Sequence, residues 1–173
     1  MTRFFIWNCQ LPRIPSAWRE RLRDFGTYAS GALFTIGWWF FIDGLILSRA
    51  ESSSVTFGFE DWIPGILCTL GMIVTNSIDL SLLRDDSFGY GGGSSLAGKA
   101  KLTLFIGIAL LAGGVAGSLT ILVIKYIVPQ VDSATMYVGA TGVLQAFGVL
   151  LASVVLWFVH NSEYDSQYNF VLN

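Results

Sequence analysis

The chain has 173 residues, of which 53% are hydrophobic and only 13% are charged. A soluble globular domain has about 25% charged residues, so this composition excludes an ordinary water-soluble domain and indicates burial in lipid. The net charge of −2 excludes an overall basic field of the kind that attracts nucleic acid, and no nucleic-acid partner is expected.

The N-terminal segment, residues 1–24, is predicted to be cytosolic and to end in a short amphipathic helix. In the stretch IPSAWRERLRD, Pro15 and Ser16 mark the start of that helix. Trp18 and Leu22 share one face, and arginines surround the rest. Two interpretations stay open: a helix lying on an anionic membrane surface, and a charged cap that precedes a membrane span.

Four long apolar runs follow and predict an all-α membrane protein with four transmembrane helices in one bundle. Each run has at least 22 residues, which exceeds the ~30 Å hydrocarbon thickness at about 1.5 Å rise per residue. In lipid the backbone must satisfy its own hydrogen bonds, so each run is expected to be helical. The predicted spans are 25–48, 62–83, 102–128 and 136–159, within a domain 25–160 that precedes a C-terminal tail, 161–173.

The basic residues predict the orientation of these spans. Eight of the ten Lys and Arg residues fall in the N-terminal segment or between the second and third spans. The other two, Arg49 and Lys125, belong to the opposite side. Since Lys and Arg accumulate on the cytosolic side, both termini are predicted to be cytosolic.

Asp43 interrupts the first span in the stretch GWWFFIDG. It is predicted about 27 Å along its helix, close to the lumenal side. A charge in hydrocarbon costs at least a few kcal/mol, so such a residue faces a partner or water. We expect Asp43 to approach Lys125, which lies at a similar depth, or to bond to neighbouring polar groups.

Further polar residues lie in the second and fourth spans. Asn76 and Asp79 share a helix face, and Gln145 is an amide that needs a partner. Asp43 and Asp79 are separated by about 20 Å in depth, which excludes a catalytic carboxylate dyad. Together with Lys125, these residues are interpreted as contacts that hold the helices together, with a proton or ion route as the alternative.

Small residues predict where the helices pack closely, because they allow backbones to approach in lipid. The third span has Ala109, Gly113 and Gly117 at a spacing of four, and the fourth has Gly142 with Ala146. We expect these residues to pack within the bundle. A surface for a second membrane protein is the alternative.

No catalytic chemistry is expected from the residues present. The chain has one histidine and two cysteines, without the spacing of a metal site. No nucleophile and base cluster together, so the chain is predicted not to be an enzyme. No catalytic, metal or cofactor site is predicted, and bound lipid is the one ligand left open.

The motifs GALFTIGWWFFIDG, RDDSF and YVGATGVLQAFG resemble the family of transmembrane protein 50 and vacuolar protein sorting-associated protein 68. The C-terminal NSEYDSQYNFVLN is similar to the fungal branch. The resemblance covers nearly the whole chain from about residue 25. The matching positions are Gly37, Trp38, Trp39, Asp43, Asn76, Arg84, Ser87 and Gln145. At Asp85 the other branch has glycine, so no role is carried over there.

The resemblance implies a four-span, non-enzymatic subunit of endosome or vacuole membranes that acts in endosome-to-vacuole protein sorting. It implies a partner, another small four-span protein of the obesity-receptor gene-related family, and a link to the endosomal vesicle-budding machinery. The alternative function is a small transporter or channel that uses Asp43, Asn76 and Asp79. Loss of flux without loss of fold on neutralising these residues would distinguish it.

Overall fold

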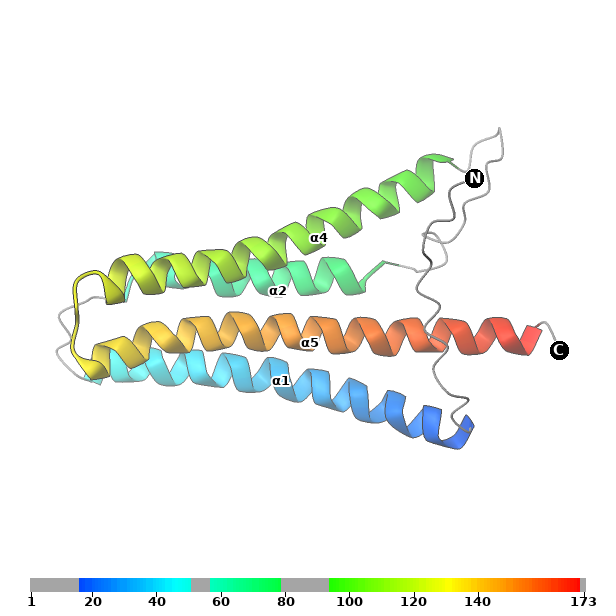
Figure 1. Ribbon diagram of the computed structural model, residues 1–173, viewed down its shortest axis with the longest axis horizontal. Helices are drawn as coiled ribbons and strands as arrows, with labels where there is room; N and C mark the ends of the chain where they lie inside the picture. Colours follow the sequence, from blue (N-terminus) through cyan, green and yellow to red (C-terminus); the bar gives the residue numbers. More distant parts are fainter. Residues whose placement is uncertain (1–15, 51–56, 79–93, 172–173) are drawn as a thin grey trace, which may run out of the picture.

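The computed structural model describes residues 16–50, 57–78 and 94–171, which form four antiparallel helices (Figure 1). No β-strand occurs among these described residues. A short 3-10 helix, η1, precedes α2, and a π-helical segment, η2, extends α4. The elements are α1 (Ser16–Ala50), η1 (Phe59–Asp61), α2 (Ile63–Asn76), α4 (Ser94–Ile121), η2 (Leu122–Ile127) and α5 (Ser133–Val171).

Three of the helical segments are long and apolar enough to cross a membrane: Arg23–Ala50, Gly98–Ile127 and Ser133–His160. They contain 28, 30 and 28 residues, which is about 42–45 Å of helix. The all-helical prediction is therefore confirmed for the described residues, and these three helices support a membrane protein. Helix α2 has 14 residues and is about 21 Å long, shorter than the ~30 Å hydrocarbon layer.

The prediction of a separate amphipathic helix before the first span was wrong. Helix α1 begins at Ser16 and continues without interruption to Ala50, so residues 16–24 are its first turns. No proline lies between them and the apolar run. The single Gly26 costs a helix only about 1 kcal/mol relative to alanine, which is too little to end it.

Helix α2 ends seven residues before the predicted boundary at Leu83. The Asn76 side chain donates to the carbonyl of Met72 at 2.9 Å, and the Ser77 hydroxyl donates to the carbonyl of Ile73 at 2.6 Å. Such local bonds offer the backbone an alternative to further helix. The rest of the predicted span lies outside the described residues.

The other two long helices extend beyond their predicted ends. Helix α4 begins at Ser94 rather than at 102, because Leu, Ala and Lys in its first turns favour helix. It ends with η2 just before Pro129. Helix α5 passes the predicted end at 159 and reaches Val171, since no glycine or proline follows Gly148.

The helices pack as two pairs, α1 with α5 and α2 with α4, and α2 also contacts α5 (Figure 1). In the first pair, a Cβ atom on Gly148 would lie 3.2 Å from the Gly37 Cα atom. One on Gly44 would meet the Thr141 hydroxyl. Close backbone approach at small residues is how helices associate where lipid removes the hydrophobic drive.

The second pair packs through Gly114 and not through Gly113. A Cβ atom on Gly114 would lie 2.9 Å from the Pro64 carbonyl oxygen, whereas nothing lies within 4 Å of one on Gly113. Ala109 and Gly113 are exposed, so placing them in the bundle interior was wrong. The helix turns about 100° per residue, and the apolar run does not reveal which glycine faces inward.

The remaining predicted packing residues lie closer to the interior. Gly117 is half-buried near the Pro64 ring, and Gly142 is half-buried in a position where a Cβ atom would have no neighbour within 4 Å. Ala146 is fully buried and forms the core cluster with Cys68, Leu111 and Val149.

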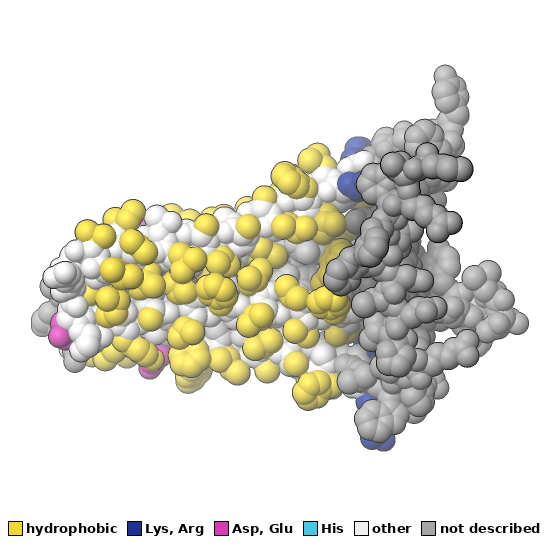
Figure 2. Space-filling model, viewed as in Figure 1, with side chains coloured by type: hydrophobic (Ala, Val, Ile, Leu, Met, Phe, Trp, Pro, Cys, Tyr) yellow, Lys and Arg dark blue, Asp and Glu magenta, His cyan; other side chains and the backbone are white. Residues whose placement is uncertain are grey.

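Hydrophobic side chains cover the shaft of the bundle, and charges lie toward its ends (Figure 2). On the face shown, Lys and Arg gather at the end where α1 begins and α5 finishes, and Asp and Glu gather at the other. Long apolar helices with charged ends match the thickness and polarity of a bilayer.

Candidate functional site

A cluster of charged and polar residues joins the start of α2 to the end of α4. The Lys125 ammonium donates to a Glu60 carboxylate oxygen at 2.8 Å and to Asp61 Oδ2 at 2.5 Å. The Tyr126 hydroxyl lies 3.5 Å from Asp61 Oδ1 as a donor. These four residues are called the lysine clamp below. They join segments 64 or more residues apart in the sequence.

Short non-α segments position both halves of the lysine clamp. In η1, the Gly58 backbone N–H donates to Asp61 Oδ2 at 2.8 Å, which fixes the carboxylate at the start of α2. Lys125 and Tyr126 lie in η2, where the Val128 N–H bonds to the carbonyl of Val123 five residues back. Single π-helical turns within α-helices are frequent at functional sites.

Burial makes Asp61 the electrostatic centre of the lysine clamp. Its residue exposure is 7%, so its charge has lost most of its water. Three donors replace that water: the Lys125 ammonium, the Gly58 N–H and the Tyr126 hydroxyl. A buried carboxylate needs such compensation, because an unpaired charge in the interior is very unfavourable.

Glu60 lies outside the apolar segments and is solvent-exposed. The hydrogen bond from Lys125, the Glu60 backbone N–H and the positive charge of Lys125 together hold the pKa of this carboxyl below its usual range. The charged form is therefore favoured, and the contact with Lys125 persists at neutral pH.

A cluster of four aromatic side chains lies beside the lysine clamp. The Phe41 ring, which is 1% exposed, makes edge-to-face contacts with Trp38, Phe57 and Trp62 at centroid distances of 5.8, 5.4 and 5.0 Å. Such contacts are worth about 0.5–1.5 kcal/mol each beyond burial. A cavity of about 20 Å³ between this group and Tyr126 has room for roughly one water molecule.

Asp43 and Lys125 do not pair, so that prediction was wrong. Lys125 is occupied by the acidic residues of η1. Asp43 lies on an exposed side of α1 and accepts a hydrogen bond from the Tyr137 hydroxyl of α5 at 2.9 Å. The alternative prediction, a bond from Asp43 to a neighbouring polar group, matches this contact.

The predicted amides lie between helices. The Asn76 side chain donates to the Ser153 hydroxyl of α5 at 3.1 Å. Gln145 is 1% exposed and its Nε2 atom has no partner among the described residues. It faces Gly65, where a Cβ atom would lie 2.5 Å from Gln145 Nε2. Only glycine therefore leaves room for this amide.

The other predicted positions differ in their surroundings. Gly37 is buried against α5, Trp38 is half-buried and Trp39 is 72% exposed. The Nε1 atom of Trp38 is buried and has no partner within the described part of the chain. Asp79, Arg84 and Ser87 lie outside the described residues.

Sequence reasoning did not single out Asp61, Glu60 or Tyr126. One signal was present: the acidic pair precedes the second apolar run, at the bundle end that also contains Lys125. Asp43 was more conspicuous because it interrupts an apolar run. A carboxylate at the end of an apolar run is interpreted as a solvated loop residue unless its burial is known.

The lysine clamp can hold helix ends together, and its chemistry favours that role over bond making. Among the described residues, no three His, Cys, Asp or Glu side chains come close enough to bind a metal. Asp43 and Asn76 lie in different surroundings, one exposed on α1 and one between α2 and α5, so these two do not line a common polar path.

The chain is similar to several known proteins. Residues 4–166 match the Uncharacterised protein family (UPF0220). Vacuolar protein sorting-associated protein 68 of Saccharomyces cerevisiae is 39% identical, over 87% of this chain and 89% of its own length. UPF0220 protein C8D2.02c of Schizosaccharomyces pombe is 36% identical over 87% and 88%. The Transmembrane protein 50 homolog of Dictyostelium discoideum is 32% identical over 85% and 98%. No solved structure gives a significant match.

Proposed function

Because this chain belongs to the Uncharacterised protein family (UPF0220), we propose that it is a non-enzymatic integral membrane subunit that acts in endosome-to-vacuole protein sorting. One observation carries the proposal: 39% identity, over nearly the whole of both chains, to a protein named for vacuolar protein sorting. The apolar helices support a membrane location. Endosome or vacuole membranes are the proposed site of action.

We also propose that four helices cross the bilayer with both ends of the chain in the cytosol. The start of α1 and the finish of α5 lie at the same end of the bundle (Figure 1). Arg21, Arg23, Lys99 and Lys101 belong to helix ends on that side, as expected for a cytosolic face. Protease protection of tagged termini in sealed vesicles tests this, and opposite accessibility of the two tags would contradict it.

A complementation experiment tests the sorting role. The chain is expressed in S. cerevisiae lacking vacuolar protein sorting-associated protein 68, and the fraction of a vacuolar hydrolase that is secreted is measured. We expect secretion to fall toward the wild-type value. A chain that is expressed in the correct membranes but leaves secretion unchanged would contradict the proposal. Gly31→Ala should complement as well as the unchanged chain, because nothing lies within 4 Å of a methyl group added there.

The proposed partner is another small four-span protein, of the obesity-receptor gene-related family, and the proposed pathway includes the endosomal vesicle-budding machinery. Ala109 and Gly113 support a partner surface, because they place small residues on the exposed side of α4. Small residues let a second helix approach closely in lipid.

Co-purification tests this surface directly. Gly113→Leu should reduce recovery of the small four-span partner from gently solubilised membranes. Gly31→Leu is the control, because Gly31 is also exposed and a Cβ atom there would have nothing within 4 Å, but it lies on α1. Equal recovery with both variants would contradict this surface and leave the sorting role to the complementation result.

A further inference from the structure

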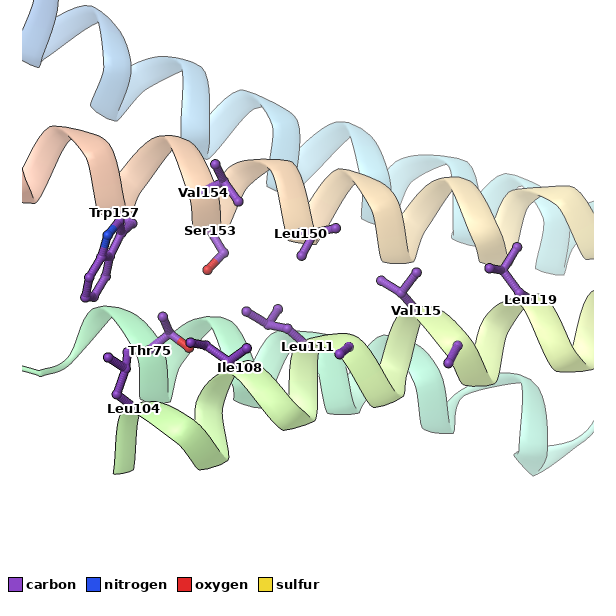
Figure 3. A pocket seen from close by; sticks show the side chains of 12 residues that line it. Thr75, Leu104, Ile108, Leu111, Val115, Leu119, Leu150, Ser153, Val154 and Trp157 are labelled. Carbon is purple, nitrogen blue, oxygen red and sulfur yellow. The ribbon is translucent and has the colours of Figure 1, made fainter. Parts of the chain in front are cut away.

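An apolar groove of about 600 Å³ opens between α4 and α5, with α2 as its floor (Figure 3). It runs from Leu104 to Leu119 on α4, about 22 Å at 1.5 Å per residue. Its volume is within the range of about 300–1,000 Å³ found for small-molecule sites. None of the described side chains that line it is charged.

The groove exists because each of its walls is attached to a different neighbour. Helix α4 is held close to α2 at Gly107 and Gly114, and α5 is held close to α1 at Gly148. Between α4 and α5, larger side chains such as Ile108 and Leu150 face the gap. The two helices diverge toward the start of α4 (Figure 1).

Two hydroxyl groups lie at one end of this apolar surface, near Trp157 (Figure 3). Thr75 is 6% exposed, and its Oγ1 atom is buried without a partner among the described residues. Ser153 is 2% exposed and its hydroxyl accepts from Asn76. Within the described part of the chain, no acceptor for the Ser153 hydroxyl proton is found.

Thr75 differs from most of the threonines among the described residues. Five other threonines donate their hydroxyl to the backbone carbonyl four residues earlier, at 2.8–3.1 Å. These threonines are Thr27, Thr35, Thr69, Thr103 and Thr120. A buried hydroxyl without a partner is unfavourable, so a ligand that supplies a partner gains affinity there.

A partner helix would not fit inside the groove. A helix of about 10 Å diameter along 22 Å of groove would displace roughly 1,700 Å³, more than the groove's whole empty volume of about 1,160 Å³. The uncharged lining also offers nothing to a phosphate group. What fits is a slender apolar body with one neutral hydroxyl at one end.

We propose that this groove binds a sterol, with the sterol hydroxyl bonded to Thr75 and Ser153 and the ring system extending toward Leu119. Trp157 lies about 6 Å beyond Ser153 along α5 and covers the polar end of the ligand. A rigid ring system loses little conformational entropy on binding, which favours a sterol over a flexible acyl chain. This site is independent of the sorting role and of the partner surface.

Binding of tritiated cholesterol to the full chain, purified in detergent micelles, tests the proposal. We expect saturable binding that unlabelled cholesterol displaces. Cholestane, which lacks the hydroxyl, should compete about tenfold less well, and Thr75→Val or Ser153→Ala should weaken cholesterol binding by a similar factor. Dioleoylphosphatidylcholine should not displace the label.

Filling the groove provides a second, independent variant. Ala112 is an exposed alanine of α4 that lines the groove, and Ala109 is an exposed alanine of the same helix that does not. Ala112→Phe should abolish cholesterol binding, and Ala109→Phe should retain it, with both proteins unfolding at the wild-type temperature. Unchanged binding by Ala112→Phe, equal competition by cholestane, or displacement by phosphatidylcholine would overturn the proposal. So would native mass spectrometry showing a second copy in place of sterol.

Discussion

Two polar contacts connect remote parts of the chain at the same end of the bundle, and they differ in burial. Asp61 is 7% exposed and receives the Lys125 ammonium, a backbone N–H and a tyrosine hydroxyl. Asp43 is exposed and accepts one hydrogen bond from Tyr137. The comparison shows that a carboxylate inside an apolar run need not be the buried one, since a helix presents each residue to only one side.

Replacing Lys125 by methionine should produce the largest effect. Asp61 would lose its main partner while buried, and breaking such a buried pair costs about 3–5 kcal/mol. Chemical unfolding in detergent micelles measures the loss. Arg49→Met is the control, because Arg49 is an exposed basic residue at the same end of the bundle.

The double variant Lys125→Met with Asp61→Asn sharpens the comparison further. Removing both charges eliminates the unpaired carboxylate, and asparagine can still accept from the Gly58 N–H. We therefore expect the double variant to recover at least half of the lost free energy of unfolding. A double variant as unstable as Lys125→Met alone would show that the buried charge is not the cause.

The same contrast between inside and outside applies to two adjacent glycines of α4. Gly114→Ala should destabilise the chain by about 1–3 kcal/mol, because the new methyl group meets the Pro64 carbonyl and the backbone N–H of Cys68. Gly113→Ala should stay within about 0.5 kcal/mol of the wild type. Equal unfolding midpoints for the two variants would contradict the assigned face of α4.

The contact of Tyr137 with Asp43 should matter much less. Tyr137→Phe removes the hydroxyl, but Asp43 is exposed, so no charge is left buried without a partner. The thermal unfolding curve should be nearly superimposable on that of the wild type. A loss as large as that of Lys125→Met would reverse the ranking of the two contacts.

The pH dependence of Glu60 should be the smallest effect. Its pKa lies below the ordinary value of 4.5, so its contribution is present above that value and is lost as the pH falls through the lower, folded pKa. Unfolding midpoints measured from about pH 6 downward should show this fall, and Glu60→Gln should remove it. An unchanged profile in that variant would assign the acid sensitivity to other carboxylates.

The apolar runs predicted the helices and their order, and the predicted end of the third span at 128 lies one residue past the end of η2. The ends that depend on local chemistry were less predictable. Asn76 and Ser77 end α2 through side-chain bonds, while nothing at residues 24–25 or 159–161 stops a helix. A hydropathy pattern identifies the residues that prefer lipid. A helix can extend beyond those residues, so the pattern does not give the ends of the helix.

The amino-acid sequence by itself determined that this protein is helical and apolar, because an isolated backbone in lipid has no other way to satisfy its hydrogen bonds. Only the tertiary structure decided that Lys125 pairs with Asp61 and Glu60, that Gly114 faces inward and Gly113 outward, and that a groove remains between α4 and α5. Those outcomes depend on the rotation of each helix about its axis. Rotation is set by contacts between helices, and no pattern within one segment contains it.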